Sequence, residues 1–249
     1  MLPSAQTPLV ELNDITKSFG NVRALRGVSL VLHPSEITAI VGDNGSGKST
    51  LINILSGNLK QDSGTIAIGG EQFPKLTPKL AMKAGISTVY QDLSLDDYRD
   101  TAANIFLGNE RTAFGLLSRK SMRRQALELI DMLKVGISDI MLPVRTLSGG
   151  QRQAVAIARA VHRGEKLMIF DEPTAAMGVR ESNAVLRLVE QMARRGFAVL
   201  IISHNLHHVF SIADRICIMR HGKILHKVDK QSATLEEVQR LITDAEDMD

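Results

Sequence analysis

The 249-residue sequence contains no tryptophan, two tyrosines and a single cysteine, Cys217. One cysteine cannot form a disulfide within the chain, which indicates a reducing compartment and a buried apolar role for this residue. No stretch approaches the roughly 20 apolar residues that a membrane-spanning helix requires. The N-terminus shows no basic segment followed by an apolar one, so we expect no signal peptide. Any attachment to a membrane is therefore expected to go through a partner.

An excess of charge of one sign is also missing, because 30 basic residues face 27 acidic ones. This balance gives no reason to expect a nucleic-acid partner. Hydrophobic residues make up 44% of the sequence and aromatic residues only 4%, so the core must be mainly aliphatic. Such a core suits an α/β sheet, and the length suits one domain, with or without an inserted subdomain.

The hydrophobic pattern changes along the chain. Strand patterns occupy 9–33 and return at 165–172, whereas helical spacing dominates from about residue 97 to residue 162. The chain contains neither an internal repeat nor a low-complexity linker. We therefore predict an α/β core at 8–92 and 163–225, a helical subdomain at 93–162 and a helical tail at 226–249.

A glycine-rich loop lies between an apolar strand pattern and a helical one. The stretch "GDNGSGKS", residues 42–49, matches G-x-x-x-x-G-K-[ST] in the strand–loop–helix context that this motif requires. Backbone N–H groups of such a loop turn toward one point, and the following helix N-terminus favours an anion. We expect Lys48 to reach the β- and γ-phosphates of a nucleotide and Ser49 to bind Mg²⁺. The predicted phosphate-binding residues are Gly42, Asp43, Asn44, Gly45, Ser46, Gly47, Lys48, Ser49 and Thr50.

Two carboxylates follow a second buried strand pattern. The apolar run Leu167–Phe170 ends in Asp171 and Glu172, at the strand end where open α/β sheets bind ligands. Since adjacent side chains on a strand point in opposite directions, one acid can approach a metal ion while the other approaches water. We predict that Asp171 binds Mg²⁺ and that Glu172 is the general base.

A third motif carries a family resemblance. Residues 146–153 read "TLSGGQRQ" and lie between the glycine loop and "IFDEP", an order that resembles the ABC-type ATPases over about residues 8–225. The resemblance implies a P-loop NTPase core of mostly parallel strands flanked by helices, an N-terminal antiparallel β part and an inserted helical subdomain. It also implies that a second phosphate-facing helix end, formed by Ser148, Gly149, Gly150 and Gln151, completes the ATP site of another subunit in a head-to-tail homodimer. On its own, the motif is also compatible with a simple capped helix start.

Three further roles come from the resemblance alone. Gln91 in "VYQDL" looks like the glutamine that contacts Mg²⁺ or water and leads into the helical part, and His204 in "IISHN" looks like the histidine that contacts the γ-phosphate. Phe19 in "ITKSFG" occupies the place of an aromatic residue that packs against adenine, although a core position fits it equally well. These residues complete the predicted catalytic set of Lys48, Gln91, Glu172 and His204.

One stretch departs from the usual family pattern. After "DEPT" the family usually has Ser-Ala-Leu-Asp, whereas this chain has Ala175-Ala176-Met177-Gly178. The acid that normally signals across the dimer is therefore missing. The same stretch, together with "ISHNLHHVFSIADRI", resembles the ATPases of bacterial monosaccharide importers.

The resemblance implies an ATPase subunit that powers sugar uptake from the cytoplasmic face of the inner membrane. Its expected partners are ATP, a second copy of the chain, integral-membrane permease subunits and, indirectly, a sugar-binding protein. The helical part and the segment after Gln91 would receive a helix of the permease. A non-transport ATPase of DNA repair, ribosome release or cluster assembly is the alternative, but Ser148 follows Lys48 by only 100 positions, which leaves no room for a long coiled coil. The intact Lys48, Asp171, Glu172 and His204 argue against a non-catalytic scaffold.

Overall fold

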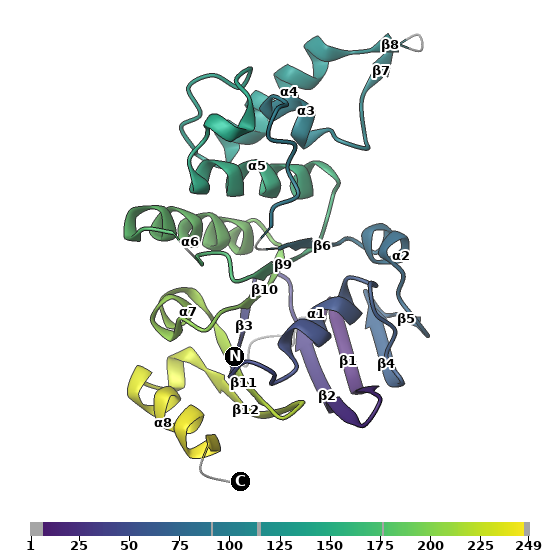
Figure 1. Ribbon diagram of the computed structural model, residues 1–249, viewed down its shortest axis with the longest axis vertical. Helices are drawn as coiled ribbons and strands as arrows, with labels where there is room; N and C mark the ends of the chain where they lie inside the picture. The colour runs from purple at the N-terminus through teal and green to yellow at the C-terminus, as the bar shows by residue number, and fades with distance from the viewer. Residues whose placement is uncertain (1–6, 91, 114–115, 176, 247–249) are drawn as a thin grey trace.

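The computed structural model describes residues 7–90, 92–113, 116–175 and 177–246 (Figure 1). Its centre is a six-stranded sheet in the order β12-β11-β3-β10-β9-β6. All neighbouring strands are parallel except β11 and β12, which are antiparallel. The strands are β3 (Ile37–Val41), β6 (Ile86–Val89), β9 (Leu167–Asp171), β10 (Ala198–Ile202), β11 (Arg215–Arg220) and β12 (Lys223–Asp229).

A second sheet is fully antiparallel, in the order β2-β1-β4-β5. Its strands are β1 (Val10–Phe19), β2 (Val22–Leu32), β4 (Ser63–Ile68) and β5 (Glu71–Phe73). This arrangement confirms the predicted mostly parallel core with an N-terminal antiparallel part.

The helices divide into groups along the long axis of the molecule (Figure 1). Helices α3 and α4 lie at one end with α5, and α8 lies at the other end. Within the described residues, no helix is long and apolar enough to cross a membrane. The helices are α1 (Lys48–Leu55), α2 (Pro78–Lys83), α3 (Thr101–Ile105), α4 (Arg119–Met132), α5 (Gly149–His162), α6 (Val179–Arg194), α7 (Leu206–Ile212) and α8 (Leu235–Glu246).

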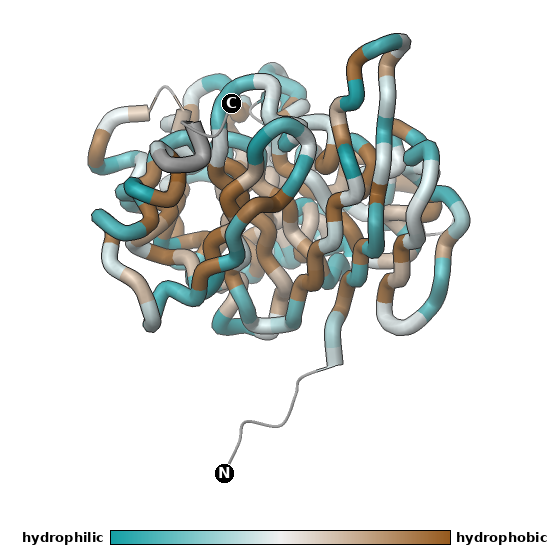
Figure 2. The backbone as a smooth tube through the Cα atoms, turned by 90° about the horizontal axis from the view of Figure 1, so that it is seen from below, coloured by the Kyte–Doolittle hydropathy of each residue, from teal (hydrophilic) through white to brown (hydrophobic). Residues whose placement is uncertain are grey.

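The core consists of two apolar clusters on opposite faces of the six-stranded sheet. On β3, Ala39 and Val41 belong to the cluster packed against α5 and α6, whereas Ile40 belongs to the cluster shared with α1 and the antiparallel sheet. This alternation is the period of two that a strand imposes on its side chains. Strands buried on both faces therefore appear as continuous hydrophobic segments inside the molecule (Figure 2). Cys217 is fully buried in the second cluster, and burial raises the pKa of its thiol to about 11, as its apolar context predicted.

Some elements were not anticipated from the sequence. A two-stranded hairpin, β7 (Thr112–Ala113) and β8 (Leu116–Leu117), precedes α4. The short helix α2 was also missed, and β12 continues to Asp229, past the predicted start of the helical tail at 226. Such short elements give too few positions for a periodic signal. The proposed domain boundaries remain a prediction.

One buried acid has no role in the predicted chemistry. Glu165, just before β9, is only 4% exposed, and its Oε2 atom has no hydrogen-bond partner among the described residues. Burial raises the pKa of this carboxyl to about 7, although Arg163 and a hydrogen bond with Ser87 act in the opposite direction. Glu165 therefore holds a proton in the folded chain over a pH range in which the unfolded chain has released it.

We expect Glu165→Gln to change how stability depends on pH. An acid whose folded-state pKa lies above its unfolded value destabilises the fold progressively as pH rises from the unfolded pKa to the folded one. Wild-type protein should therefore lose more thermal stability than Glu165→Gln between about pH 5 and pH 7.5. Thermal unfolding of both proteins across this range, with the surface variant Glu190→Gln as control, measures the difference. Parallel curves for wild type and Glu165→Gln would contradict the assignment.

Candidate functional site

The glycine loop connects β3 to α1 at the carboxyl edge of the parallel strands, and its backbone requires glycine. Gly42, Gly45 and Gly47 have φ angles of 149°, 84° and 109°, a region that other residues rarely adopt. A Cβ on Gly47 would lie 2.6 Å from the carbonyl oxygen of Ala24 on β2. The loop thus owes its path to glycine and to close packing against the neighbouring sheet.

The end of this loop presents hydrogen-bond donors. The helix α1 begins at Lys48 with no side-chain cap and no acid in its first turn. Among the described residues, the N–H groups of Gly47, Lys48 and Ser49 have no acceptor. Ser49 is exposed beside them. Because free N–H groups and the helix dipole point the same way, this loop could hold phosphate oxygens.

Lys48 lies across the same loop. Its Nζ donates to the carbonyl oxygens of Gly42 (2.6 Å) and Asp43 (2.7 Å) and to the hydroxyl of Ser46 (3.3 Å). Burial lowers the pKa of this ammonium, whereas Glu172, Asp43 and Asp171 oppose that shift. The sequence motif therefore places the Lys48 ammonium in a partly buried position, where it interacts electrostatically with nearby carboxylates.

Asp171 and Glu172 come from the end of β9. Burial raises the pKa of Asp171, Glu172 raises it further, and Lys48 lowers it. Asp171 is the last residue paired with β10, whereas Glu172 lies just beyond the strand with a φ of 50°. The backbone therefore leaves regular strand geometry at Glu172, which the sequence reasoning, based on regular strand alternation, did not anticipate. Such backbone angles are uncommon outside glycine and are enriched at functional sites.

The carboxylate of Glu172 is held by His204, which follows β10. The Oε1 atom of Glu172 accepts a hydrogen bond from the backbone N–H of His204 at 3.0 Å, and Oε2 of Glu172 lies 3.0 Å from His204 Nδ1. The imidazole itself remains 74% exposed. The two residues predicted to act on water and on the terminal phosphate are thus directly bonded.

The donor set fits Mg²⁺ only in combination with phosphate. No group of three or more histidine, cysteine, aspartate or glutamate side chains within the described residues could hold a metal ion by itself. Asp171 and Ser49 instead offer one carboxylate and one hydroxyl. Mg²⁺ prefers oxygen ligands and in nucleotide sites takes most of them from phosphates and water. These two residues could therefore complete the shell of a nucleotide-bound ion.

The "LSGGQ" stretch forms the start of α5. Ser148 caps the helix, because its hydroxyl accepts from the N–H of Gln151 (3.3 Å) while the Gln151 side-chain oxygen accepts from the N–H of Ser148 (2.9 Å). Gln151 also donates to the carbonyl of Gly136 at 2.7 Å. The structural interpretation of this motif as a capped helix start is thus correct. Among the described residues, the N–H groups of Gly149 and Gly150 have no acceptor, so the cap leaves donors available.

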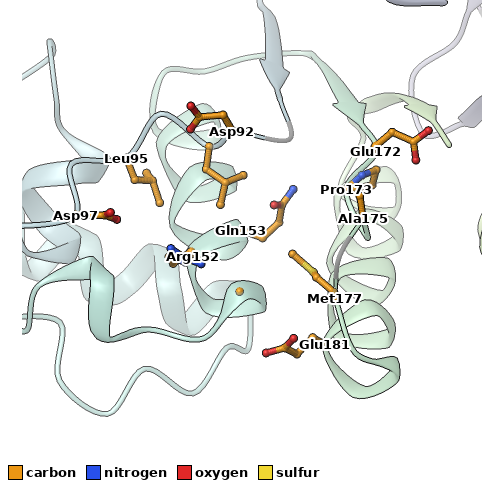
Figure 3. Close-up of a pocket in the computed structure, with 12 residues that line it drawn as sticks. Asp92, Leu95, Asp97, Arg152, Gln153, Glu172, Pro173, Ala175, Met177 and Glu181 are labelled. Carbon is orange, nitrogen blue, oxygen red and sulfur yellow. The ribbon is translucent and has the colours of Figure 1, made fainter. Parts of the chain in front are cut away.

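A cavity of about 560 Å³ separates this helix start from Glu172 (Figure 3). Arg152 and Gln153 of α5 face Ala175 and Met177 across it. The Gln153 amide nitrogen is buried and has no partner among the described residues. The cavity is lined by Asp92, Leu93, Leu95, Asp97, Gly149, Arg152, Gln153, Glu172, Pro173, Ala175, Met177 and Glu181. Glu172 and Gly149 therefore border one space, but neither Lys48 nor its loop does.

The remaining predicted residues lie outside this cavity. Asp43 and Asn44 are exposed on the glycine loop, and Thr50 lies in the first turn of α1. Phe19 ends β1 with half of its surface exposed, which rules out the core position that its sequence context left open. Gln91 lies outside the described residues, so its role stays a prediction.

Sequence reasoning missed Arg159. Its guanidinium donates to the carbonyl oxygens of Leu93 (2.8 Å) and Ser94 (2.9 Å) and so attaches the segment after residue 91 to the last turn of α5. Burial lowers the pKa of this group, and Arg163 lowers it further. The available signal was an arginine within the apolar run "AVAIARAV", since a cation on such a helix face needs an acceptor.

Gly178 is the residue just before α6, and its backbone conformation does not require glycine. Its φ and ψ are −69° and 165°, it provides no side-chain cap, and a Cβ at this position would meet no atom within 4 Å. We expect Gly178→Asp to cap the helix, interact favourably with its dipole and stabilise the fold by about 0.5 kcal/mol. Thermal unfolding should then show a gain of about 1–2 °C.

Alanine provides the matched control, because it adds a Cβ but no cap. Gly178→Ala should melt at or below the wild-type temperature. An aspartate variant no more stable than the alanine variant would contradict the capping argument.

Comparison with known proteins shows to which family this chain is related. A family model described as "ABC transporter" matches residues 25–175. The xylose/arabinose import ATP-binding protein of Sulfolobus acidocaldarius is 43% identical, over 94% of this chain and 94% of that protein. The fructose import ATP-binding protein of Rhizobium meliloti is 41% identical, over 98% and 96% of the two chains. A ribose import ATP-binding protein of Escherichia coli O157:H7 is 39% identical over 95% of this chain but only 46% of its own length.

Solved structures with a similar fold belong to the same family. A nucleotide-free ATP-binding cassette from an ABC transporter superposes with a TM-score of 0.81 at 26% identity, covering 95% of this chain and 96% of that one. A dimeric cassette in a post-hydrolysis state, bound to ADP and Pi, gives a TM-score of 0.75 at 27% identity, covering 89% and 98%. The family match, the whole-length relatives and the shared fold together show that this chain belongs to the ABC transporter family, as one of its ATP-hydrolysing cassettes.

Proposed function

We propose that this chain is the ATPase subunit of a monosaccharide importer and that it works as a head-to-tail homodimer. The observation that supports the homodimer is the separation of the two phosphate-facing helix ends within one chain. The lysine loop leads into α1, whereas the serine-capped end belongs to α5 in the other half of the molecule (Figure 1). Since the two ends lie in different halves of one chain, two copies in a head-to-tail arrangement can supply one end each to a single triphosphate.

Within this proposal each end has a defined task. The N–H groups of the glycine loop and Lys48 bind the β- and γ-phosphates, and Phe19 packs against adenine. Asp171 and Ser49 hold Mg²⁺, which neutralises phosphate charge when bound. Ser148 and the N–H groups of Gly149 and Gly150 reach the γ-phosphate of the partner's nucleotide. Gln91 would contact Mg²⁺ or water, a role that rests on the family resemblance.

Glu172 is proposed as the general base. The hydrogen bond from the backbone N–H of His204 holds the Glu172 carboxylate in place, and a fixed position is what proton abstraction from water requires. The His204 ring lies beside the same carboxylate, with Nδ1 3.0 Å from Glu172 Oε2, so a phosphate oxygen that contacts this ring would also act on the environment of Glu172. His204 thereby links phosphate binding to the placement of the base.

The helical end of the molecule supports a permease contact. A second cavity, of about 550 Å³, opens there between α3, α4 and the hairpin. It includes Tyr98, Leu117, Met122 and Met141, and Tyr98 is 77% exposed. A concave surface that combines apolar side chains with charged ones, such as Arg99 and Glu110, suits a short amphipathic helix. We assign it to a cytoplasmic helix of the permease, on the cytoplasmic face of the membrane. A sugar-binding protein would then act on the other side, without touching this chain.

Deletion of the gene in its native host tests the proposal. Uptake of labelled ribose, xylose, arabinose, fructose and other monosaccharides would be measured in the deletion strain, with an amino acid as the control substrate. Uptake of at least one monosaccharide should fall by about tenfold or more, return with the wild-type gene and not return with Lys48→Ala. Unchanged uptake of the whole panel would refute sugar import.

A further inference from the structure

One surface combines exposed leucines with closely spaced cations and takes no part in the proposed nucleotide chemistry. We call it the hairpin patch. Leu116 of β8 is 75% exposed, Leu117 is 54% exposed and Leu127 on α4 is 53% exposed. The hairpin projects from the helical end of the molecule and leads directly into α4 (Figure 1). The patch consists of Leu116, Leu117, Arg119, Lys120, Arg123, Arg124 and Leu127.

The charge of the patch is not neutralised by the chain itself. Residues 110–124 hold five arginines and lysines but only one acid, Glu110, and that carboxylate accepts the N–H of Gly108 at 3.1 Å. Among the described residues, Arg119, Lys120 and Arg123 form no ion pair. Arg124 reaches Glu128 only at 3.9 Å, with both side chains largely exposed, which adds little.

The cations also oppose the helix that carries them. They occupy the first two turns of α4, where the helix dipole is positive, and this end has neither an acid in its first turn nor a side-chain cap. Arg119 and Arg123 are four residues apart, as are Lys120 and Arg124, so like charges stack along the helix. A sequence that breaks several local preferences at one place is expected where function requires it.

We propose that the hairpin patch binds anionic lipid headgroups of the membrane in which the permease lies. This inference rests on the proposed function, because Leu117, Arg119 and Arg123 also border the cavity assigned to the permease. Clustered cations are attracted to anionic lipid surfaces, and exposed leucines beside them can enter the headgroup region. A projecting hairpin can press into a bilayer surface, because that surface is deformable. A protein surface would need a hollow of matching shape.

A vesicle flotation assay on the full chain tests this binding. Vesicles of phosphatidylcholine alone would be compared with vesicles containing about 30% phosphatidylglycerol. We expect the bound fraction to be at least about threefold higher on the anionic vesicles, and to fall when salt rises from about 0.05 M to 0.5 M. The double variant Lys120→Gln/Arg124→Gln and the single variant Leu116→Ser should each reduce binding on anionic vesicles.

The matched control is Lys223→Gln/Lys227→Gln, which removes the same two charges from exposed positions on β12 and should bind like wild type. Equal loss in both double variants would mean that overall charge, not the patch, drives binding, and would overturn the proposal. Absence of binding to anionic vesicles would overturn the proposal too. If, in addition, Lys120→Gln/Arg124→Gln releases a copurifying permease, the patch binds that protein and not lipid. Sugar uptake in the deletion strain is independent of these results, so failure of the lipid proposal is distinguishable from failure of the importer proposal.

Discussion

Replacing Lys48 with alanine should reduce ATP hydrolysis by at least about a hundredfold, since a preorganised charge on a phosphoryl group contributes on this scale. Lys48 is the cation that the structure places inside the glycine loop, with its Nζ 2.6 Å from the carbonyl of Gly42. Alanine leaves the loop backbone and its N–H groups in place but removes the charge. Phosphate release from the purified chain with ATP and Mg²⁺ measures the effect.

Lys60→Ala is the control for this experiment, because Lys60 is an exposed lysine shortly after α1. It should retain wild-type turnover. Thermal unfolding of Lys48→Ala establishes that the variant is folded, since the lysine also bonds to the loop. A folded Lys48→Ala protein with undiminished turnover would refute the assigned role.

Glu172→Gln should slow hydrolysis by about a hundredfold or more, the contribution typical of a general base, and should leave ATP binding intact. The amide has nearly the same shape as the carboxylate and its oxygen can still accept the backbone N–H of His204, which Glu172 Oε1 now accepts at 3.0 Å. It cannot take a proton from water. The ATP-bound homodimer should therefore accumulate, and size-exclusion chromatography with and without ATP would detect it.

The control is Glu190→Gln on α6, where the carboxylate lies 3.7 Å from the exposed guanidinium of Arg194. This variant should hydrolyse ATP and show no persistent dimer. If Glu172→Gln elutes as a monomer at saturating ATP, the head-to-tail arrangement loses its support. If it still turns over like wild type, Glu172 is not the base.

The elements that carry phosphate chemistry could be predicted because each joins a fixed motif to a long hydrophobic pattern. The buried strands β3 and β9 fixed where the glycine loop and Asp171 emerge. The glycine loop was expected to turn its backbone N–H groups toward one point, and the glycines at 42, 45 and 47 have the positive φ angles that suit such a turn. In these places local sequence and tertiary environment favour the same structure.

Other features depend on contacts between distant residues, which no local pattern reports. The left-handed backbone at Glu172 and the contacts of this residue with His204 depend on β10 packing beside β9. Arg159 binds carbonyls 66 and 65 positions earlier in the chain. The raised pKa of Glu165 likewise follows from burial and could not be predicted from its neighbours in sequence.

The arginine contacts inside the helical part have a mechanical consequence. The chain enters this part just before Leu93 and leaves it after α5, and Arg159 ties the entry segment to α5. Arg163 adds a second tie, donating to the carbonyl of Leu107 at 2.8 Å. Because these segments are fastened to the end of one helix, a rotation of the helical part would have to take α5 with it. A force applied by a membrane partner at the far hairpin would therefore act through a lever on the serine-capped end of α5.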